Sequence, residues 1–303
     1  MNQTPTLKRT TRPATPAELP VDPIAKARIF WCLRRYSSLA YAKQAAELLR
    51  KFTGGFDAWA RQAPARRTLF SRRALQTLYG ALGAYEEAPD LLLKNFKTRA
   101  YAALERAGFL RELLGPAFEG GMQWAEFGYG FEERPSTGLF AWAERALRMT
   151  ARIRLTIAAE WAETRILSEG PPERFLPRRF PARLDPLPAP KGPVIDVGED
   201  VPVTGVWLPI DVPNACPNFL VEATPAPKAL CEATRIDTGA FPGDAERPPR
   251  PATTMYVYER VPSRWQLVWE DIRYRTGIEP DESEFLDEET AFPKDPPVHP
   301  PPS

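Results

Sequence analysis

The stretch Val201–Thr224 reads VPVTGVWLPIDVPNACPNFLVEAT and divides the chain into two unlike halves. Two short apolar runs, Val201–Ile210 and Phe219–Val221, lie on either side of the segment DVPNACPN. Proline and asparagine between short apolar runs favour a turn and exclude a continuous helix. The stretch therefore predicts two strands, at 201–210 and 217–222, that begin a small sheet.

Composition changes at about the same place. Of the 35 prolines, nine lie in residues 1–170 and 26 in residues 171–303. Residues 1–169 contain 26 Lys and Arg against 17 Asp and Glu, a net charge of +9, and the remainder contains 14 against 22, a net charge of −8. Each half could have its own solvated surface, the halves could neutralise one another where they touch, or one patch could attract a charged partner.

Residues 22–170 predict an all-helical domain. Apolar residues recur at helical spacing after Asp22-Pro23, where Asp22 can cap free amides and Pro23 occupies the first helical position. Glycine and proline follow each periodic run and are expected to end it. The expected helices cover 23–53, 71–85, 90–108 and 137–169.

The second half predicts a small β-rich domain at 194–278. Residues 253–260 and 265–275 mix β-branched and aromatic residues, and the four residues VPSR between them suit a hairpin. The Pro/Ala-rich region 224–252 is expected to be a long loop. A sheet this small needs another layer to cover one face, so the two halves are expected to fold as one unit.

The remaining segments predict little regular structure. Residues 171–193 hold eight prolines and should form a linker, or an arm extended over the helices. Residues 1–21 should be disordered, and residues 279–303 should form an acidic, then Pro-rich, flexible tail. The expected fold class is α+β, with an N-terminal helical bundle packed against a smaller, mainly antiparallel β region with long Pro-rich loops.

The sequence argues against several kinds of chemistry. Its one histidine, His299, lies in the terminal run PPVHPPP, so no Ser-His-Asp triad, Cys-His dyad or usual zinc site is expected. The cysteines Cys32, Cys216 and Cys231 form no CxxC pair, which fits a reducing cytoplasm. We expect no catalytic, cofactor or metal site and no membrane span, since no run approaches about 18–20 apolar residues. An enzyme with a carboxylate-only site remains a third hypothesis.

Aromatic residues on the expected strands form a second candidate feature. Trp207, Trp265 and Trp269 all fall there, and Trp265 and Trp269, four apart, share one face of a strand. That face either packs on the helical domain or forms an aromatic interaction surface.

Paired basic residues suggest an alternative function in the helical half. These pairs are Arg34-Arg35, Arg50-Lys51, Arg66-Arg67 and Arg72-Arg73. They fall mostly on the outer faces of the expected helices, where any solvated helix places arginine. Nucleic-acid or regulatory binding through this half is therefore the alternative interpretation, without a nucleic-acid fold signature to accompany it.

Three segments resemble bacterial polymorphic-toxin immunity proteins, in particular immunity protein 72 and its sister family 71. They are IFWCLRRYSS at 29–38, TGVWLPIDVPNACPNFLVEATPAP at 204–227, and WQLVWEDIRYR at 265–275 with the acidic DESEFLDEET that follows it up to residue 290. The resemblance implies a cytoplasmic protein that neutralises a cognate toxin delivered by cell contact, as by a type VI secretion system. It implies stoichiometric binding of a toxin domain rather than catalysis.

The acidic second half is expected to supply much of the toxin interface, because toxins that handle nucleic acid or nucleotides tend to have basic clefts. Candidate contacts are the strand tryptophans Trp207, Trp265 and Trp269 and the acidic residues Glu270, Asp271, Asp281, Glu282 and Glu284. The sequence leaves the oligomeric state open.

Overall fold

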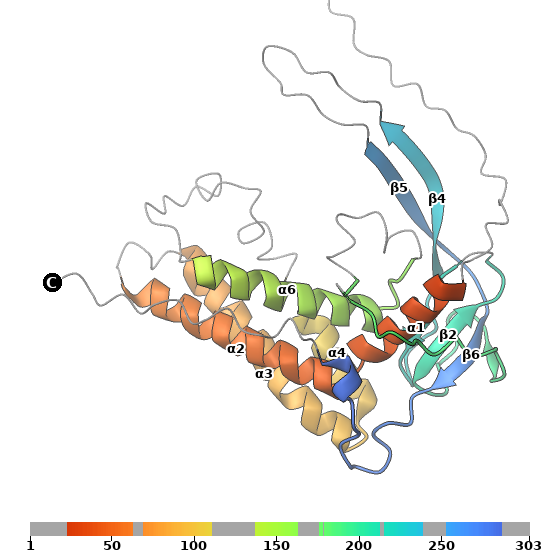
Figure 1. Ribbon diagram of the computed structural model, residues 1–303, viewed down its shortest axis with the longest axis horizontal. Helices are drawn as coiled ribbons and strands as arrows, with labels where there is room; N and C mark the ends of the chain where they lie inside the picture. The colour runs from red at the N-terminus through yellow and green to blue at the C-terminus, as the bar shows by residue number, and fades with distance from the viewer. Residues whose placement is uncertain are drawn as a thin grey trace, which may run out of the picture.

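The computed structural model describes residues 23–62, 69–110, 137–162, 176–177, 179–212, 215–238 and 253–286. Within these ranges the N-terminal half is helical and the C-terminal part holds a small antiparallel sheet, so the expected α+β class is confirmed (Figure 1). The expected tail at 1–21 and residues 287–303 of the tail expected at 279–303, with His299, lie outside the described residues.

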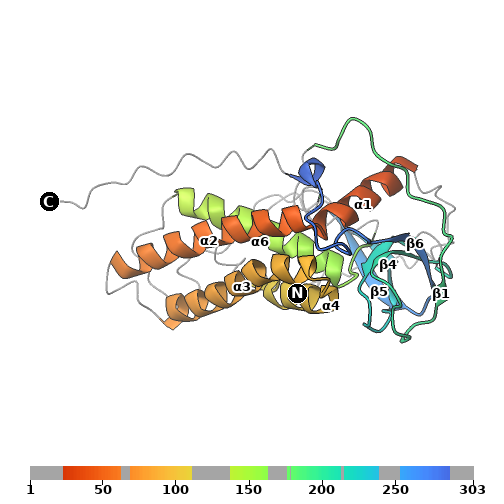
Figure 2. The same ribbon diagram turned by 90° about the horizontal axis from the view of Figure 1, so that it is seen from below.

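The helical half is built around three long helices. They are α2 (Leu39–Gln62), α3 (Leu69–Leu93) and α6 (Thr137–Ile157), with the shorter α1 (Pro23–Tyr36) and α4 (Lys97–Ala107). The helix α2 packs against α3 and α6, and α4 packs against the same two helices (Figure 2). Buried side chains such as Phe52, Leu78 and Leu147 fill the space between them.

The helix boundaries differ from those expected. The helix predicted over 23–53 breaks at Ser37-Ser38, where the Ser37 and Ser38 hydroxyls donate to the carbonyls of Leu33 and Arg35 at 2.7 and 2.6 Å. Such side-chain bonds compete with helical hydrogen bonds. Conversely Gly54-Gly55, expected to end a helix, lies inside α2.

Gly55 instead permits close packing. A Cβ at Gly55 would lie 3.0 Å from the Leu139 side chain and 3.2 Å from that of Trp142, so the missing side chain lets α6 approach α2. Pro89 likewise lies within α3, which runs on to Leu93. The helix predicted over 137–169 ends at Ile157.

The main sheet has the strand order β1-β6-β2-β3, and every neighbouring pair is antiparallel. Its strands are β1 (Val194–Ile195), β2 (Gly205–Pro209), β3 (Asn218–Leu220) and β6 (Trp265–Glu270). The pairing of β2 with β3 confirms the strand–turn–strand interpretation of the opening stretch.

Two further strands form a separate ribbon, which corrects two expectations. The strand β5 (Thr253–Val261) pairs with β4 (Ala229–Thr238) rather than with β6, and β4 lies inside the segment expected to be a loop. Alternating polarity identifies a strand, but a ladder partner depends on contacts distant in sequence, which no local pattern encodes.

One core joins the helices to the main sheet. Val206 and Phe219 belong to the same buried cluster as the helical side chains, and the Phe219 ring meets that of Tyr101 edge-on at 5.4 Å. The described part of the Pro-rich segment 171–193 lies over this core, as expected for an arm extended over the helices. The Phe180 ring lies edge-on to that of Trp31 at 5.6 Å. The two halves therefore form one packed unit.

The prediction of a flexible tail over 279–303 is wrong for residues 279–286. The chain from 271 to 286, here called the strap, leaves β6 and returns to the α1–α2 junction, where it forms the short helix η4 (Ser283–Phe285). Phe285 is buried, and its carbonyl oxygen accepts a hydrogen bond from Arg35 at 3.0 Å.

Candidate functional site

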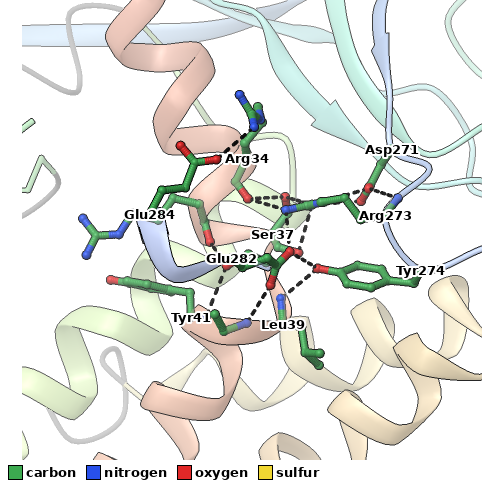
Figure 3. Close-up of polar contacts among 12 residues, drawn as sticks. Arg34, Ser37, Leu39, Tyr41, Asp271, Arg273, Tyr274, Glu282 and Glu284 are labelled. Atoms are coloured by element: carbon green, nitrogen blue, oxygen red, sulfur yellow. Dashed lines mark hydrogen bonds and ion pairs between the residues drawn. The ribbon is translucent and has the colours of Figure 1, made fainter. Parts of the chain in front are cut away.

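Buried charged residues gather where the strap meets the α1–α2 junction (Figure 3). We call this group the clamp and define it by Ser37, Asp271, Arg273, Tyr274 and Glu282. Ser37 comes from the break between α1 and α2, and the other four come from the strap. The clamp therefore connects segments more than 230 residues apart in the sequence.

Arg273 is the centre of the clamp. Its guanidinium pairs with both carboxylate oxygens of Asp271, at 2.8 and 2.9 Å, and with Glu282 at 3.2 Å. It also donates to the Arg34 carbonyl oxygen at 2.8 Å and to the Ser37 hydroxyl at 2.9 Å. A planar guanidinium with five N–H donors can satisfy this many acceptors at once.

Glu282 and Tyr274, which are distant in sequence, cap the first turn of α2. The Ala40 amide donates to Glu282 at 2.8 Å, and the Leu39 amide donates to the Tyr274 hydroxyl at 2.8 Å. That hydroxyl donates in turn to Glu282 at 2.8 Å. A helix N-terminus leaves amides unpaired and favours negative charge nearby. The strap therefore adds to the local cap, in which the Ser38 hydroxyl accepts from the Tyr41 amide at 3.1 Å.

The sheet and α4 close the other side of the clamp. The Asp271 amide donates to the carbonyl oxygen of Thr204 just before β2, at 2.8 Å. Lys97 donates to the Asp271 carbonyl oxygen, and the Tyr101 hydroxyl donates to the Ser37 carbonyl oxygen at 3.0 Å. The clamp thus holds α1, α2, α4 and β2 in one position.

The electrostatics keep the clamp charged. Burial alone raises the pKa of Asp271, but the charge and hydrogen bonds of Arg273 outweigh it and hold that pKa below its usual value. Burial opposes the charge of Arg273, yet Asp271 raises the Arg273 pKa well above its usual value. Burial also raises the pKa of Tyr274. Near neutral pH Asp271 and Arg273 therefore stay charged and Tyr274 stays neutral, which suits a structural role.

The structure separates the predicted contact residues into three groups. Trp207, Trp265, Asp271 and Glu282 are all at most 5% exposed, so the expectation that they face a partner is wrong for these four. Trp207 and Trp265 fill a second core, because their indoles are the largest apolar groups available to cover the sheet. Asp271 and Glu282 are buried because each has a buried partner in Arg273.

Trp269 occupies an intermediate place. Its ring lies edge-on to Phe30 at 6.1 Å, with the guanidinium groups of Arg34 and Arg273 at 5.9 and 5.4 Å from its centroid. It packs against the helical core, as one of the two sequence interpretations expected.

The other three predicted contacts remain accessible on or beside the strap. Glu270 pairs with Arg275, Glu284 pairs with Arg34 at 3.1 Å, and Asp281 accepts from the Ser283 amide at 3.0 Å. The apolar residues beside them were not predicted from the sequence. Ile272, Ile278 and Leu286 on the strap are 55%, 71% and 49% exposed. The sequence signal that could have identified them is the occurrence of isolated isoleucines between charged residues.

Two of the basic pairs of the helical half make internal contacts, whereas Arg72 and Arg73 are exposed on α3. Arg35 is buried, and Arg34 bonds to Asp185 as well as to Glu284. Arg50 pairs with Glu86 at 2.9 Å and Lys51 with Glu47 at 3.7 Å. Arg66-Arg67 lies outside the described residues.

A groove of about 510 Å³ lies between α3 and α4. Gly80, Gly83, Ala84 and Ala103 leave it open because their side chains are small. Among its described lining residues, Glu87 is the one carboxylate, so the groove does not assemble a carboxylate pair.

Within the described ranges, no three His, Cys, Asp or Glu side chains gather as a metal site would require. No described helix combines the length and apolar character needed to cross a bilayer. Burial raises the pKa of the Cys32 thiol to about 12, which suppresses its thiolate.

Comparison with known proteins gives no relative. No family model, no curated protein and no solved structure matches the chain.

Proposed function

We propose that this protein is an immunity protein that binds a cognate, contact-delivered toxin in the cytoplasm and neutralises it by stoichiometric binding. The observation that carries the proposal is the convergence of the three segments that resemble immunity proteins 72 and 71. Segment 29–38 supplies Arg34 and Ser37, segment 204–227 supplies Thr204, and segment 265–290 supplies the strap. Segments that resemble one family thus meet at one buried structure.

The strap offers the surface that best fits a protein partner. Its clamp residues face inward and fix its backbone, while Ile272, Ile278 and Leu286 are exposed among carboxylates. Exposed apolar side chains with a polar surround are typical of protein interfaces. The accessible carboxylates of Asp281 and Glu284 suit a toxin with a basic cleft, which is the electrostatic match expected for fast association.

Binding on a preformed surface costs little conformational entropy. The clamp gives the strap that property, because Arg273 attaches it to Ser37 at the α1–α2 junction and Glu282 attaches it to Ala40 in α2. A rigid acidic and apolar strip is thus the surface that we assign to the toxin.

The test uses the product of the gene adjacent to this one as the toxin. Expressed alone in a bacterial host, that product should stop growth, and co-expression of this protein should restore growth. Ile278→Lys should weaken protection, because it places a positive charge in the apolar strip. Ile24→Lys is the matched control, since Ile24 is 59% exposed near the start of α1. Growth arrest that this protein fails to relieve would refute the proposal.

A further inference from the structure

Phe96 is an exposed aromatic residue whose position the local helix does not explain. It is 51% exposed in the turn between α3 and α4, where it occupies the N-cap position of α4. Side chains that cap a helix carry an oxygen acceptor, and Phe96 makes no such hydrogen bond. Phe96 therefore contributes neither to the core nor to the start of its helix.

Arg99 is a second exposed residue that does not stabilise this helix. It lies in the first turn of α4, where a positive charge opposes the helix dipole. Its guanidinium lies 5.9 Å from the centroid of the Phe96 ring, and no carboxylate among the described residues pairs with it. Aromatic residues and arginine are enriched at protein interfaces, so the two residues have the composition of an interface pair.

The strap contacts the α3–α4 junction on both sides of Phe96. Lys97, which follows Phe96, donates to the carbonyl oxygen of Asp271. A Cβ at Gly277 would lie 3.3 Å from the Leu93 carbonyl oxygen, so the strap also passes close to the end of α3. Figure 1 shows the strap turning beside this end of the helix.

The exposed isoleucines of the strap follow these two contacts directly. Ile272 comes after Asp271 and is 55% exposed, and Ile278 comes after Gly277 and is 71% exposed. Exposed apolar side chains from the strap and from the α3–α4 junction are therefore brought to the same part of the molecule. Such a patch with a charged surround is typical of a protein interface.

The charges around this patch differ in sign from one end of the strap to the other. Asp281 and Glu284 are exposed where the strap meets α1 and α2, whereas Arg99 is exposed where it meets α3 and α4. A partner that covers the whole surface must present basic groups at one end and a carboxylate at the other. Complementary charges of this kind fix the orientation in which a partner binds.

A nucleic acid fits this surface less well than a protein does. Glu222, whose carbonyl oxygen accepts from Thr98 at 3.0 Å, is exposed beside the first turn of α4, and Asp281 is exposed on the strap. Their negative charges repel a phosphate backbone, which needs several basic contacts.

We propose that Phe96 and Arg99 extend the toxin-binding surface from the strap onto the α3–α4 junction. The toxin places an apolar side chain against Phe96 and a carboxylate against Arg99, in addition to the basic groups that face Asp281 and Glu284. The inference rests on the proposed function, because the partner is the toxin that the strap binds.

Calorimetric titration with the adjacent-gene product tests this extension. Phe96→Ala and Arg99→Glu should each raise Kd by at least about tenfold, as the loss of an interface anchor does. The matched controls are Phe109→Ala and Arg106→Glu, because both residues are exposed at the opposite end of α4. The controls should bind like the wild type. High salt should reduce the effect of Arg99→Glu and leave that of Phe96→Ala unchanged, since only the former acts through charge.

The outcomes separate this inference from the proposed function. If Ile278→Lys weakens binding while Phe96→Ala and Arg99→Glu bind like the wild type, the toxin occupies the strap alone and only the extension is wrong. Wild-type protein that does not bind the adjacent-gene product overturns both. Equal losses in the variants and their controls would also contradict the extension. Retention of single-stranded nucleic acid that both variants lose would assign the pair to nucleic acid instead.

Discussion

Replacing Arg273 with methionine should destabilise the protein more than any change to a surface ion pair. The methionine preserves most of the side-chain length but removes every donor, leaving the buried carboxylates of Asp271 and Glu282 without their common partner. Breaking a buried pair in this way costs about 3–5 kcal/mol. For a chain of this size, that corresponds to a fall in Tm of about 5–8 °C.

The assay is thermal unfolding followed by circular dichroism, with Arg264→Met as the matched control. Arg264 makes the same bidentate contact with Asp211, at 2.7 to 3.2 Å, but both side chains are exposed. Solvent screens such a pair, so its loss should lower Tm far less. If Arg273→Met melts at the temperature of Arg264→Met, the clamp does not stabilise the fold and our reasoning is wrong.

Three other predictions concern pH, thiol reactivity and packing. Because the pKa of Asp271 is lower in the folded state, its stabilising effect is complete above its unfolded pKa of about 4 and is lost as pH falls through the folded pKa. Asp271→Asn should therefore reduce the loss of unfolding free energy as the pH falls, measured by urea unfolding at a series of pH values. An unchanged slope of that free energy against pH would contradict this assignment. A thiol reagent should label the half-exposed Cys231 before Cys32, whose thiol is buried. Mass spectrometry of early time points measures the order, and labelling of Cys32 first would contradict the prediction. Gly205→Ala should lower Tm because its Cβ would overlap a carbonyl oxygen of β6, whereas Gly80→Ala, with open space around it, should stabilise α3 by about 0.5–1 kcal/mol. Equal melting temperatures for the two glycine variants would refute the packing argument.

Local patterns predicted the elements better than their partners. The β2–β3 pair was predictable because its turn contains the prolines that separate the two runs, so everything needed is local. The partner of β5 was not predictable from local sequence. The length of VPSR fits a hairpin between β5 and β6, but β5 pairs with β4, and the chain enters the main sheet at Trp265. Ladder partners are determined by which apolar faces can be buried together.

The predicted helix boundaries were wrong where a residue that usually ends a helix serves packing instead, or where side chains end a helix whose apolar pattern continues. Gly55 allows α6 to approach α2, although glycine usually marks a helix end. Ser37 and Ser38 break a helix whose apolar period continues through them, because their hydroxyls satisfy carbonyls of α1.

The clamp was not predictable, since charged residues in an acidic segment normally indicate solvated surface. Asp271 and Arg273 alternate with apolar residues in WEDIRYR, and this alternation was the one local hint. Their burial depends on Glu282 and Ser37, which are distant in sequence, so only the folded chain brings the four together.

Titration of the adjacent-gene product, which is the toxin under our proposal, with this protein tests the central claim most directly. Isothermal calorimetry measures the stoichiometry, and the toxin's activity is followed on the same samples. We predict one equivalent of binding, with toxic activity falling in proportion to the protein added and disappearing at equivalence. Loss of toxic activity at far below one equivalent would indicate catalysis. Absence of binding by the wild-type protein would contradict the account.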